Sequence, residues 1–295
     1  TLMVDGSVVA TGVVQGGSVT LTFTQLSNPG TATLTVTAFN HNPYIEDIDI
    51  IPAEGPYVML QDYDINDETG NGNGHADYDE IIRLDLIMEN MGVENAVDVS
   101  FTLNIEDDYI TVTDNIESID NIPAGESVLI EDAFEMIVGD SVPDEHTIMG
   151  TIISSDGNED WQSFLQLKLN APVIEIESLT IDDSENGNGN GELDPGEQAE
   201  ITIHYTNSGH TPALNVNAFL EAHCGPVDVS NSRIVIPSIG LFGGANAVFQ
   251  VNVEEDSPVG IPAPLFNQIS FGGYELEKTF PEKVSGACED FETGD

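Results

Sequence analysis

An acidic loop rich in glycine and asparagine occurs twice in this chain, and its residue spacing is typical of a calcium-binding loop. The copies are residues 70–80 (GNGNGHADYDE) and 187–197 (GNGNGELDPGE). Calcium takes six to eight oxygen ligands at flexible geometry, which amides and carboxylates at alternate positions of a curled backbone can supply. Each loop must therefore fold so that its oxygens converge on one point.

The second copy matches a twelve-residue calcium loop that has glycine at position six. Glu192 at position seven would contribute its backbone carbonyl, and Asp183 is predicted as an extra ligand. The alternative is a hydrated Asn-Gly turn without a metal. Counted from position one, the predicted side-chain ligands are Asn186, Asn188, Asn190, Asp194 and Glu197.

The first copy is less complete, because its position one falls on Thr69. Asp67 is predicted to supply the missing ligand, and Asp64 or Asn66 are the alternatives. The other predicted ligands keep their places, with His75 giving a backbone oxygen: Asn71, Asn73, His75, Asp77 and Glu80. The sequence thus predicts two Ca²⁺ sites.

Both loops lie beside strands, which favours a structural ion. After the second copy, apolar residues at 199, 201, 203 and 205 alternate with polar ones, and residues 82–88 repeat the pattern after the first. Period-two alternation indicates a half-buried strand. An EF-hand switch moves a pair of helices, so a strand setting argues against a switch. Asparagine ligands lower the charge and predict weak affinity, on the order of 10⁻⁴ to 10⁻³ M.

The loops belong to a longer repeat. An offset of 117 residues takes Gly70 to Gly187 and also takes residues 90–92 (NMG) to 207–209 (NSG). Runs of alternating Val, Ile, Thr and Phe, separated by turn residues, continue through both copies. We therefore predict an all-β fold of tandem antiparallel immunoglobulin-like β-sandwiches, one over residues 56–171 and one over 172–285, each with a calcium loop.

The two ends of the chain are predicted to be parts of further modules. Residues 1–55 are expected to form a partial immunoglobulin-like β-domain of about five strands, with strands at 18–24 and 33–39. Residues 286–295 are expected to begin a following module. Cys224 and Cys288 could pair as one staple or remain free thiols.

The charge balance excludes some partners. Five Lys and Arg residues stand against 53 Asp and Glu, giving a net charge of −48. Nucleic acid and anionic membrane surfaces would be repelled, and no apolar run is long enough for membrane insertion. Bound divalent cations or high salt would relieve the self-repulsion. The acidity can also be explained by a hydrated surface typical of a marine or salt-loving source, which is compatible with calcium binding.

Catalysis has little support in the sequence. His223 and Cys224 are adjacent, but neighbours on a strand point to opposite faces and cannot form a nucleophile-base pair. The remaining histidines lack zinc-ligand spacing, and the glycine-rich loops lack the following helix and lysine of a phosphate loop. Trp161 and the tyrosines are expected to fill cores. We predict that this chain is not an enzyme.

Residues 33–52 (TLTVTAFNHNPYIEDIDIIP) resemble the immunoglobulin-like domain that follows the catalytic domain of gingipain-type cysteine peptidases (family C25) of Bacteroidetes-like bacteria. The turn at residues 40–44 and the isoleucine-rich strand after it carry the resemblance. The GNGNG modules resemble calcium-binding immunoglobulin-like repeats of large secreted proteins, and residues 288–295 resemble the start of an adhesin-like module. The resemblance implies a secreted, cell-surface parent exported by a type IX system. None of the family's catalytic residues has a counterpart here.

Together these features predict a non-catalytic, calcium-stabilised extracellular stalk of a gingipain-like protein that positions a peptidase or adhesive module. Its partners would be neighbouring domains of the same polypeptide, or other copies of itself. One alternative is a structural subunit of a filament or surface layer assembled by strand exchange. Another is a carbohydrate-binding adhesin.

Overall fold

The computed structural model describes residues 1–23, 26, 30–50, 54–223 and 225–285. Its 21 strands form five sheets, which confirms the predicted all-β class of tandem, mainly antiparallel β-sandwiches. Within these residues, no helix has the length and apolar character needed to cross a bilayer.

The first sheet is small and has the strand order β2-β1-β3-β4. Its strands are β1 (Leu2–Val4), β2 (Ser7–Ala10), β3 (Gly30–Val36) and β4 (Tyr44–Ile50). Among its described residues, only Leu2, Ala10 and Ala32 are buried hydrophobic residues. Among the described residues, four strands therefore form, whereas about five were expected over residues 1–55. The expected strand at 18–24 is wrong over its described part, 18–23, because its alternating side chains find no neighbouring strand to pair with beyond a Gln15–Ser18 bridge.

The middle sandwich is built from nine strands in two sheets, ordered β10-β8-β12-β13-β6 and β5-β7-β11-β9. In β7, Ile82, Leu84, Leu86 and Met88 are fully buried and the residues between them are more exposed, as the alternation predicts. The strands are β5 (Val58–Asn66), β6 (Ala76–Asp77), β7 (Ile81–Asn90), β8 (Ala96–Ile105), β9 (Ile110–Asp114), β10 (Ile116–Ile122), β11 (Ser127–Val138), β12 (His146–Ser155) and β13 (Asp160–Asn170).

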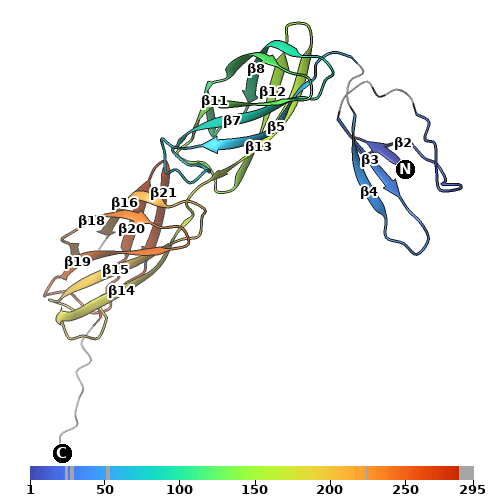
Figure 1. Ribbon diagram of the computed structural model, residues 1–295. Helices are drawn as coiled ribbons and strands as arrows, with labels where there is room; N and C mark the ends of the chain where they lie inside the picture. Colours follow the sequence, from blue (N-terminus) through green and yellow to red (C-terminus); the bar gives the residue numbers. More distant parts are fainter. Residues whose placement is uncertain (24–25, 27–29, 51–53, 224, 286–295) are drawn as a thin grey trace, which may run out of the picture.

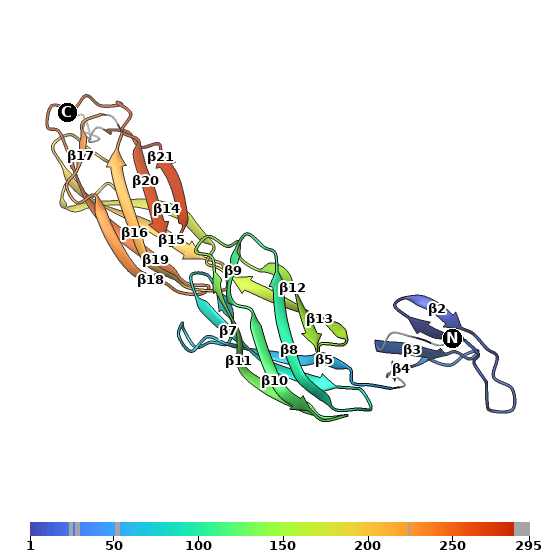
Figure 2. The same ribbon diagram turned by 90° about the horizontal axis from the view of Figure 1, so that it is seen from above.

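The last sandwich repeats this plan with sheets ordered β14-β15-β19-β17 and β18-β16-β20-β21. The two sandwiches lie end to end (Figures 1 and 2). The buried core of the last sandwich includes Tyr205 of β15, whose hydroxyl donates to Asn267 Oδ1 at 3.1 Å. The strands are β14 (Ile174–Asn186), β15 (Gln198–Asn207), β16 (Ala213–Ala222), β17 (Val227–Val229), β18 (Arg233–Ile239), β19 (Gly244–Val253), β20 (Leu265–Phe271) and β21 (Tyr274–Phe280).

Each acidic loop returns to its sandwich through a short parallel pairing. In the middle sandwich, β6 pairs in parallel with Leu169 and Asn170 at the end of β13. In the last sandwich, Leu193 makes the corresponding parallel bridge to Val284. These pairings hold both loops at the end of the sandwich where the chain leaves it.

An Asn-x-Gly corner holds the segment that enters each sandwich. Asn207 Oδ1 accepts hydrogen bonds from the Val173 and Gly209 amides, and Asn207 Nδ2 donates to the Thr211 carbonyl. Asn90 makes the equivalent bonds to Tyr57, Gly92 and Glu94. The repeated NMG and NSG triplets are therefore structural latches between a strand end and the incoming chain.

Gly209 lies too close to the incoming chain to carry a side chain. A Cβ at this position would lie 2.3 Å from the Ala171 carbonyl oxygen and 2.4 Å from the Val173 nitrogen, both rigid backbone atoms. We predict that Gly209→Ala destabilises the last sandwich by about 1–3 kcal/mol, measured by thermal or denaturant unfolding. Gly240→Ala is the matched control, because nothing lies within 4 Å of its Cβ. Equal stability of the two variants would contradict the latch.

Candidate metal-binding loops

The first loop (residues 67–80) gathers its carboxylates at the end of the middle sandwich. The amides of Asn73 and Gly74 donate to the two oxygens of Asp67 at 2.8 and 3.0 Å. Asp77 Oδ2 accepts from Asn71 Nδ2 at 2.7 Å and from Asn73 Nδ2 at 2.8 Å. Asn71 N also donates to Glu80 Oε1 at 3.0 Å. All five predicted side-chain positions are thus brought into one network.

The second loop (residues 183–197) repeats this network. Asp183 accepts from the amides of Gly189, Asn190 and Gly191. Asp194 Oδ2 accepts from Asn188 Nδ2 at 2.6 Å and from Asn190 Nδ2 at 2.9 Å, and Asn188 N donates to Glu197 Oε1 at 3.0 Å. The two loops therefore share one construction in which an aspartate organises the backbone and a second aspartate faces two asparagines.

The residues expected at position one of the twelve-residue loop lie outside these networks. Asn186 is exposed and pairs with Gln198 in the β14–β15 ladder, and Thr69 Oγ1 donates to the Ile81 carbonyl. Asp183 and Asp67 lie inside the networks. Asp64 is exposed and Asn66 donates to Asp132, so neither replaces Asp67. In each loop an aspartate further upstream lies in the network in place of the residue at position one. In the second loop the β14–β15 ladder continues through Asn186, the residue that the spacing favours.

His75 and Glu192 are exposed, and their backbone amides donate to the side-chain oxygens of Asn73 and Asn190, each at 2.8 Å. Their side chains point to solvent and take no part in the networks. Their backbone carbonyls remain the predicted ligands at these two positions.

Burial makes the carboxylates of both loops costly without a compensating charge. Asp67, Asp77, Asp183 and Asp194 are each at most 4% exposed. In the described residues, only three buried side-chain polar atoms lack a hydrogen-bond partner, and two of them are Asp194 Oδ1 and Glu197 Oε2. Buried acceptors without a donor are rare in proteins and indicate a missing ion or water.

The pKa values of the loop carboxyls reflect this crowding. Burial raises the pKa of Glu197, and the charges of Asp194 and Asp183 raise it further. Burial likewise raises the pKa of Glu80, with Asp77 and Asp67 adding to the effect. When the pKa of a carboxyl is higher in the folded state than in the unfolded state, the free energy of unfolding falls as the pH rises from the unfolded-state pKa to the folded-state pKa. A bound cation would reverse this effect by favouring the ionised form.

Asp183 behaves differently because it accepts backbone hydrogen bonds. Burial alone would raise its pKa, but donation from the Gly191, Gly189 and Asn190 amides holds the pKa below its ordinary value. This aspartate is therefore stably ionised and fixes the curl of its loop.

The donor set fits a hard cation of the calcium type. Among the described residues, no group of three or more His, Cys, Asp or Glu side chains lies close enough to hold a metal by itself. Each loop instead combines carboxylates with asparagine amides, and calcium accepts such mixed oxygen ligands. Asparagine Nδ2 groups now face Asp77 and Asp194. Turning each amide about its last bond would present Oδ1 to the same point, at the cost of the hydrogen bond that this oxygen now accepts from a backbone amide two residues later.

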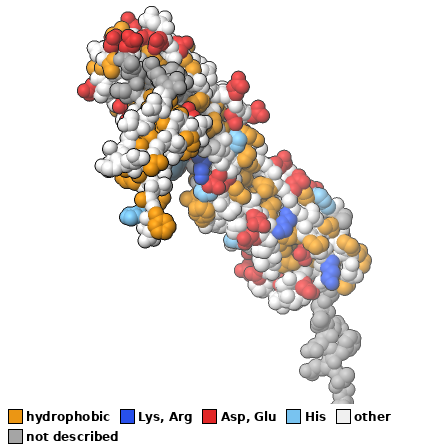
Figure 3. Space-filling view, turned by 90° about the vertical axis from the view of Figure 1, so that its right-hand side faces the viewer, with side chains coloured by type: hydrophobic (Ala, Val, Ile, Leu, Met, Phe, Trp, Pro, Cys, Tyr) orange, Lys and Arg blue, Asp and Glu red, His pale blue; other side chains and the backbone are white. Residues whose placement is uncertain are grey.

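Acidic side chains are spread along the molecule, with few basic ones among them (Figure 3). The loops are therefore distinguished by burial and geometry more than by charge.

Trp161 is 6% exposed and packs edge-on against Tyr57, so it is not available as a sugar platform. His223 stacks on Phe266. Cys224 and Cys288, which could pair or remain free thiols, lie outside the described residues.

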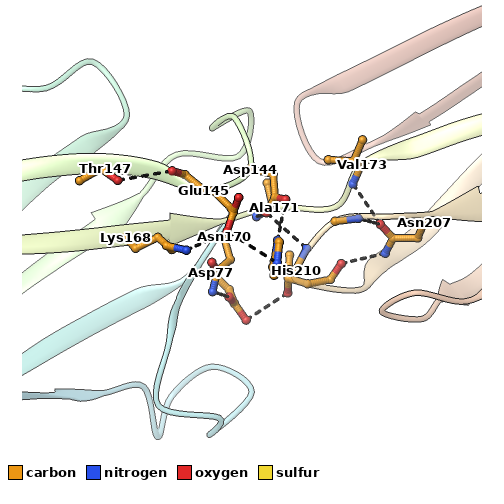
Figure 4. A network of polar contacts seen from close by, with 12 residues as sticks. Asp77, Asp144, Glu145, Thr147, Lys168, Asn170, Ala171, Val173, Asn207 and His210 are labelled. Carbon is orange, nitrogen blue, oxygen red and sulfur yellow. Dashed lines mark hydrogen bonds and ion pairs between the residues drawn. The ribbon is translucent and has the colours of Figure 1, made fainter.

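The first loop also touches the last sandwich. Thr211 Oγ1 donates to Asp77 Oδ2 at 3.0 Å, and Asn170 Nδ2 donates to Asp77 Oδ1 at 3.2 Å. Beside this contact, Asp144 accepts from the backbone amides of Ala171 and His210 (Figure 4). A cavity of about 530 Å³ opens between the loop and the last sandwich. Spacing could not reveal Thr211, because 134 residues separate it from Asp77.

No protein-family model matches the chain, and no curated protein matches it. Solved structures give distant similarities at 11% identity. The C-terminal domain of the BspA AgI/II polypeptide of Streptococcus agalactiae matches with a TM-score of 0.32, covering 78% of this chain and 100% of that one. Escherichia coli alpha-2-macroglobulin matches with a TM-score of 0.29, covering 92% of this chain and 26% of that one. At these TM-scores the matches carry no argument about the fold or the function of this chain.

The role of Asp183 can be separated from any metal. We predict that Asp183→Ala, measured in a chelator, lowers the unfolding free energy of the last sandwich by about 1–3 kcal/mol, because backbone amides lose their acceptor. Asp182→Ala is the control, since exposed Asp182 accepts backbone donation only from Ser184. If both variants unfold like the parent, the aspartate does not organise the loop.

Proposed function

We propose that this chain is a non-catalytic, calcium-stabilised support region in which each acidic loop holds one Ca²⁺ at the exit end of a β-sandwich. The observation that carries the proposal is a pair of buried oxygens, Asp194 Oδ1 and Glu197 Oε2, to which no described residue donates a hydrogen bond. They lie in a loop already lined by asparagine amides. A bound Ca²⁺ would compensate the negative charge of these carboxylate oxygens.

The residues that would hold the ions are those of the two networks. In the second loop they are Asp183, Asn188, Asn190, Asp194 and Glu197, with a backbone oxygen at Glu192. In the first loop they are Asp67, Asn71, Asn73, Asp77 and Glu80, with a backbone oxygen at His75. Asn186 is left out because it belongs to the β14–β15 ladder.

A support role follows from where the loops lie. Both occupy the end of a sandwich, beside the parallel pairing that precedes the exit of the chain. A cation there would tie the loop to the strands and oppose fraying of that end. The acidity of the chain and the weak affinity expected for asparagine-rich loops suit an extracellular setting with millimolar calcium.

The narrower proposal is a secreted, surface-exposed stalk of a gingipain-like protein, exported by a type IX system, that carries a peptidase or adhesive module. Its support is the resemblance of residues 33–52 and of the two GNGNG modules. Mass spectrometry of surface proteins from the source cells would test it, since peptides of this chain should be linked to a peptidase domain in one polypeptide. A parent without any such domain or export signal would contradict it.

Assembly by strand exchange is favoured by one feature of the first sheet. β4 is an edge strand, and six of its seven residues are exposed, including Ile45 and Ile48. Such an edge can accept an added strand. Sedimentation at increasing protein concentration would show polymers if the edge is used in this way and a single species if it is not.

The calcium proposal is tested by ligand removal. We predict that Asp194→Ala and Glu197→Ala each abolish the calcium-dependent rise in melting temperature of the last sandwich. The parent should gain about 2.7 kcal/mol when calcium is in hundredfold excess over its dissociation constant. Calorimetric melting with and without EDTA measures the difference.

The matched control for that experiment is Glu192→Ala. Glu192 is exposed and would offer only its backbone oxygen, so this variant should keep the full calcium response. The metal assignment at this loop is wrong if Glu197→Ala responds to calcium as the parent does, or if Glu192→Ala loses the response as completely as Glu197→Ala.

A further inference from the structure

The two loops differ in how their repeated aspartates are satisfied. Asp77 accepts four side-chain hydrogen bonds, from Asn71, Asn73, Thr211 and Asn170. Asp194, its counterpart 117 residues later, accepts the two equivalent asparagine bonds on Oδ2, and among the described residues no donor reaches its buried Oδ1. The difference lies in residues outside the loop.

One of the extra donors comes from the neighbouring sandwich. Thr211 is 2% exposed, and its hydroxyl reaches Asp77 Oδ2 at 3.0 Å. Its backbone is fixed, because its carbonyl accepts from Asn207 Nδ2 at 2.8 Å. The latch that pins the incoming chain therefore also aims a hydroxyl at the preceding loop.

The corresponding corner of the middle sandwich carries a residue of different chemistry. Asn90 Nδ2 donates to the Glu94 carbonyl in the same way, so Glu94 takes the place of Thr211. Its exposed carboxylate cannot donate to another carboxylate when ionised. A hydroxyl thus stands at the corner that faces an acidic loop.

We propose that Thr211 is a positioning residue for the cation of the first loop, and that through Asp77 the occupancy of this loop is coupled to the docking of the two sandwiches. The inference rests on the proposed calcium binding. Hydrogen bonds to a ligating carboxylate orient it, and their loss lowers metal affinity about 10- to 100-fold. A coupling free energy is reciprocal. If docking of the sandwiches raises the calcium affinity of the first loop by some factor, calcium binding there must raise the equilibrium constant for docking by the same factor.

The docking contact contains amides that report on it. Gly273 N donates to the Asp140 carbonyl at 2.9 Å, and Leu214 N donates to the Tyr78 hydroxyl at 3.2 Å, both across the junction. Opening of the junction would expose these amides to exchange with solvent. Their exchange rates therefore measure docking, while the amides of Gly74 and Gly191 measure events in the first and second loops.

The test is a calcium titration of the isotope-labelled full chain by NMR, comparing the parent with Thr211→Val and Thr211→Ser. Valine keeps the shape and removes the hydroxyl, and serine keeps the hydroxyl. We expect Thr211→Val to weaken calcium binding about 10- to 100-fold at Gly74 and to leave Gly191 unchanged. Calcium should slow exchange of the Gly273 amide in the parent and in Thr211→Ser, and much less in Thr211→Val.

Unchanged calcium affinity at Gly74 in Thr211→Val would overturn the inference while leaving the proposed function intact. Equal weakening at Gly74 and Gly191 would also overturn it, because that pattern indicates a general loss of structure. If neither glycine responds to calcium in the parent, the proposed function itself fails. Thr211→Ala provides a second hydroxyl-free variant should the buried valine prevent folding.

Discussion

Buried carboxylates held together at the ends of the sandwiches are the constraint on which the rest of the structure depends. In each loop one aspartate collects backbone amides, and this fixes the curl that brings the other carboxylates close. Burial, and after it the neighbouring carboxylates, raise the pKa values of Glu80 and Glu197, and the backbone amides of Asn71 and Asn188 compensate only in part. The proposed divalent cation would offset these negative charges directly, with the oxygens of each loop as its ligands.

The Asn-x-Gly corner and the acidic loop lie where the two sandwiches meet head to tail. The Asn-x-Gly corner holds the chain as it enters a sandwich, and the acidic loop lies where the chain leaves it. At the junction the corner of the last sandwich meets the loop of the middle one, with Thr211 against Asp77 and His210 against Asp144. Packing of one module on the next thus uses the residues that would surround the ion.

Much of this architecture could be predicted from the sequence, because it depends on local patterns. Alternation placed Ile82 to Met88 and Ala199 to Tyr205 on buried strand faces, and the spacing of the GNGNG segments identified eight network residues directly. Asp67 is one of three upstream candidates, with Asp64 and Asn66, and Asp183 is predicted as an extra ligand outside the twelve-residue spacing. Asn186 lies outside the network because it pairs with Gln198 in the β14–β15 ladder. Residues 18–23 alternate, but among the described residues they pair only through the Gln15–Ser18 bridge. Thr211 and Asn170 depend on contacts between distant segments, which local spacing does not encode.

The most direct test of the central claim is an anomalous difference map from crystals of the full chain grown in millimolar calcium. The account predicts one strong peak inside each loop, with Asn71 and Asn73, and likewise Asn188 and Asn190, turned so that their side-chain oxygens face it. Loops without a peak at saturating calcium, with the amide nitrogens still bonded to Asp77 and Asp194, would contradict it.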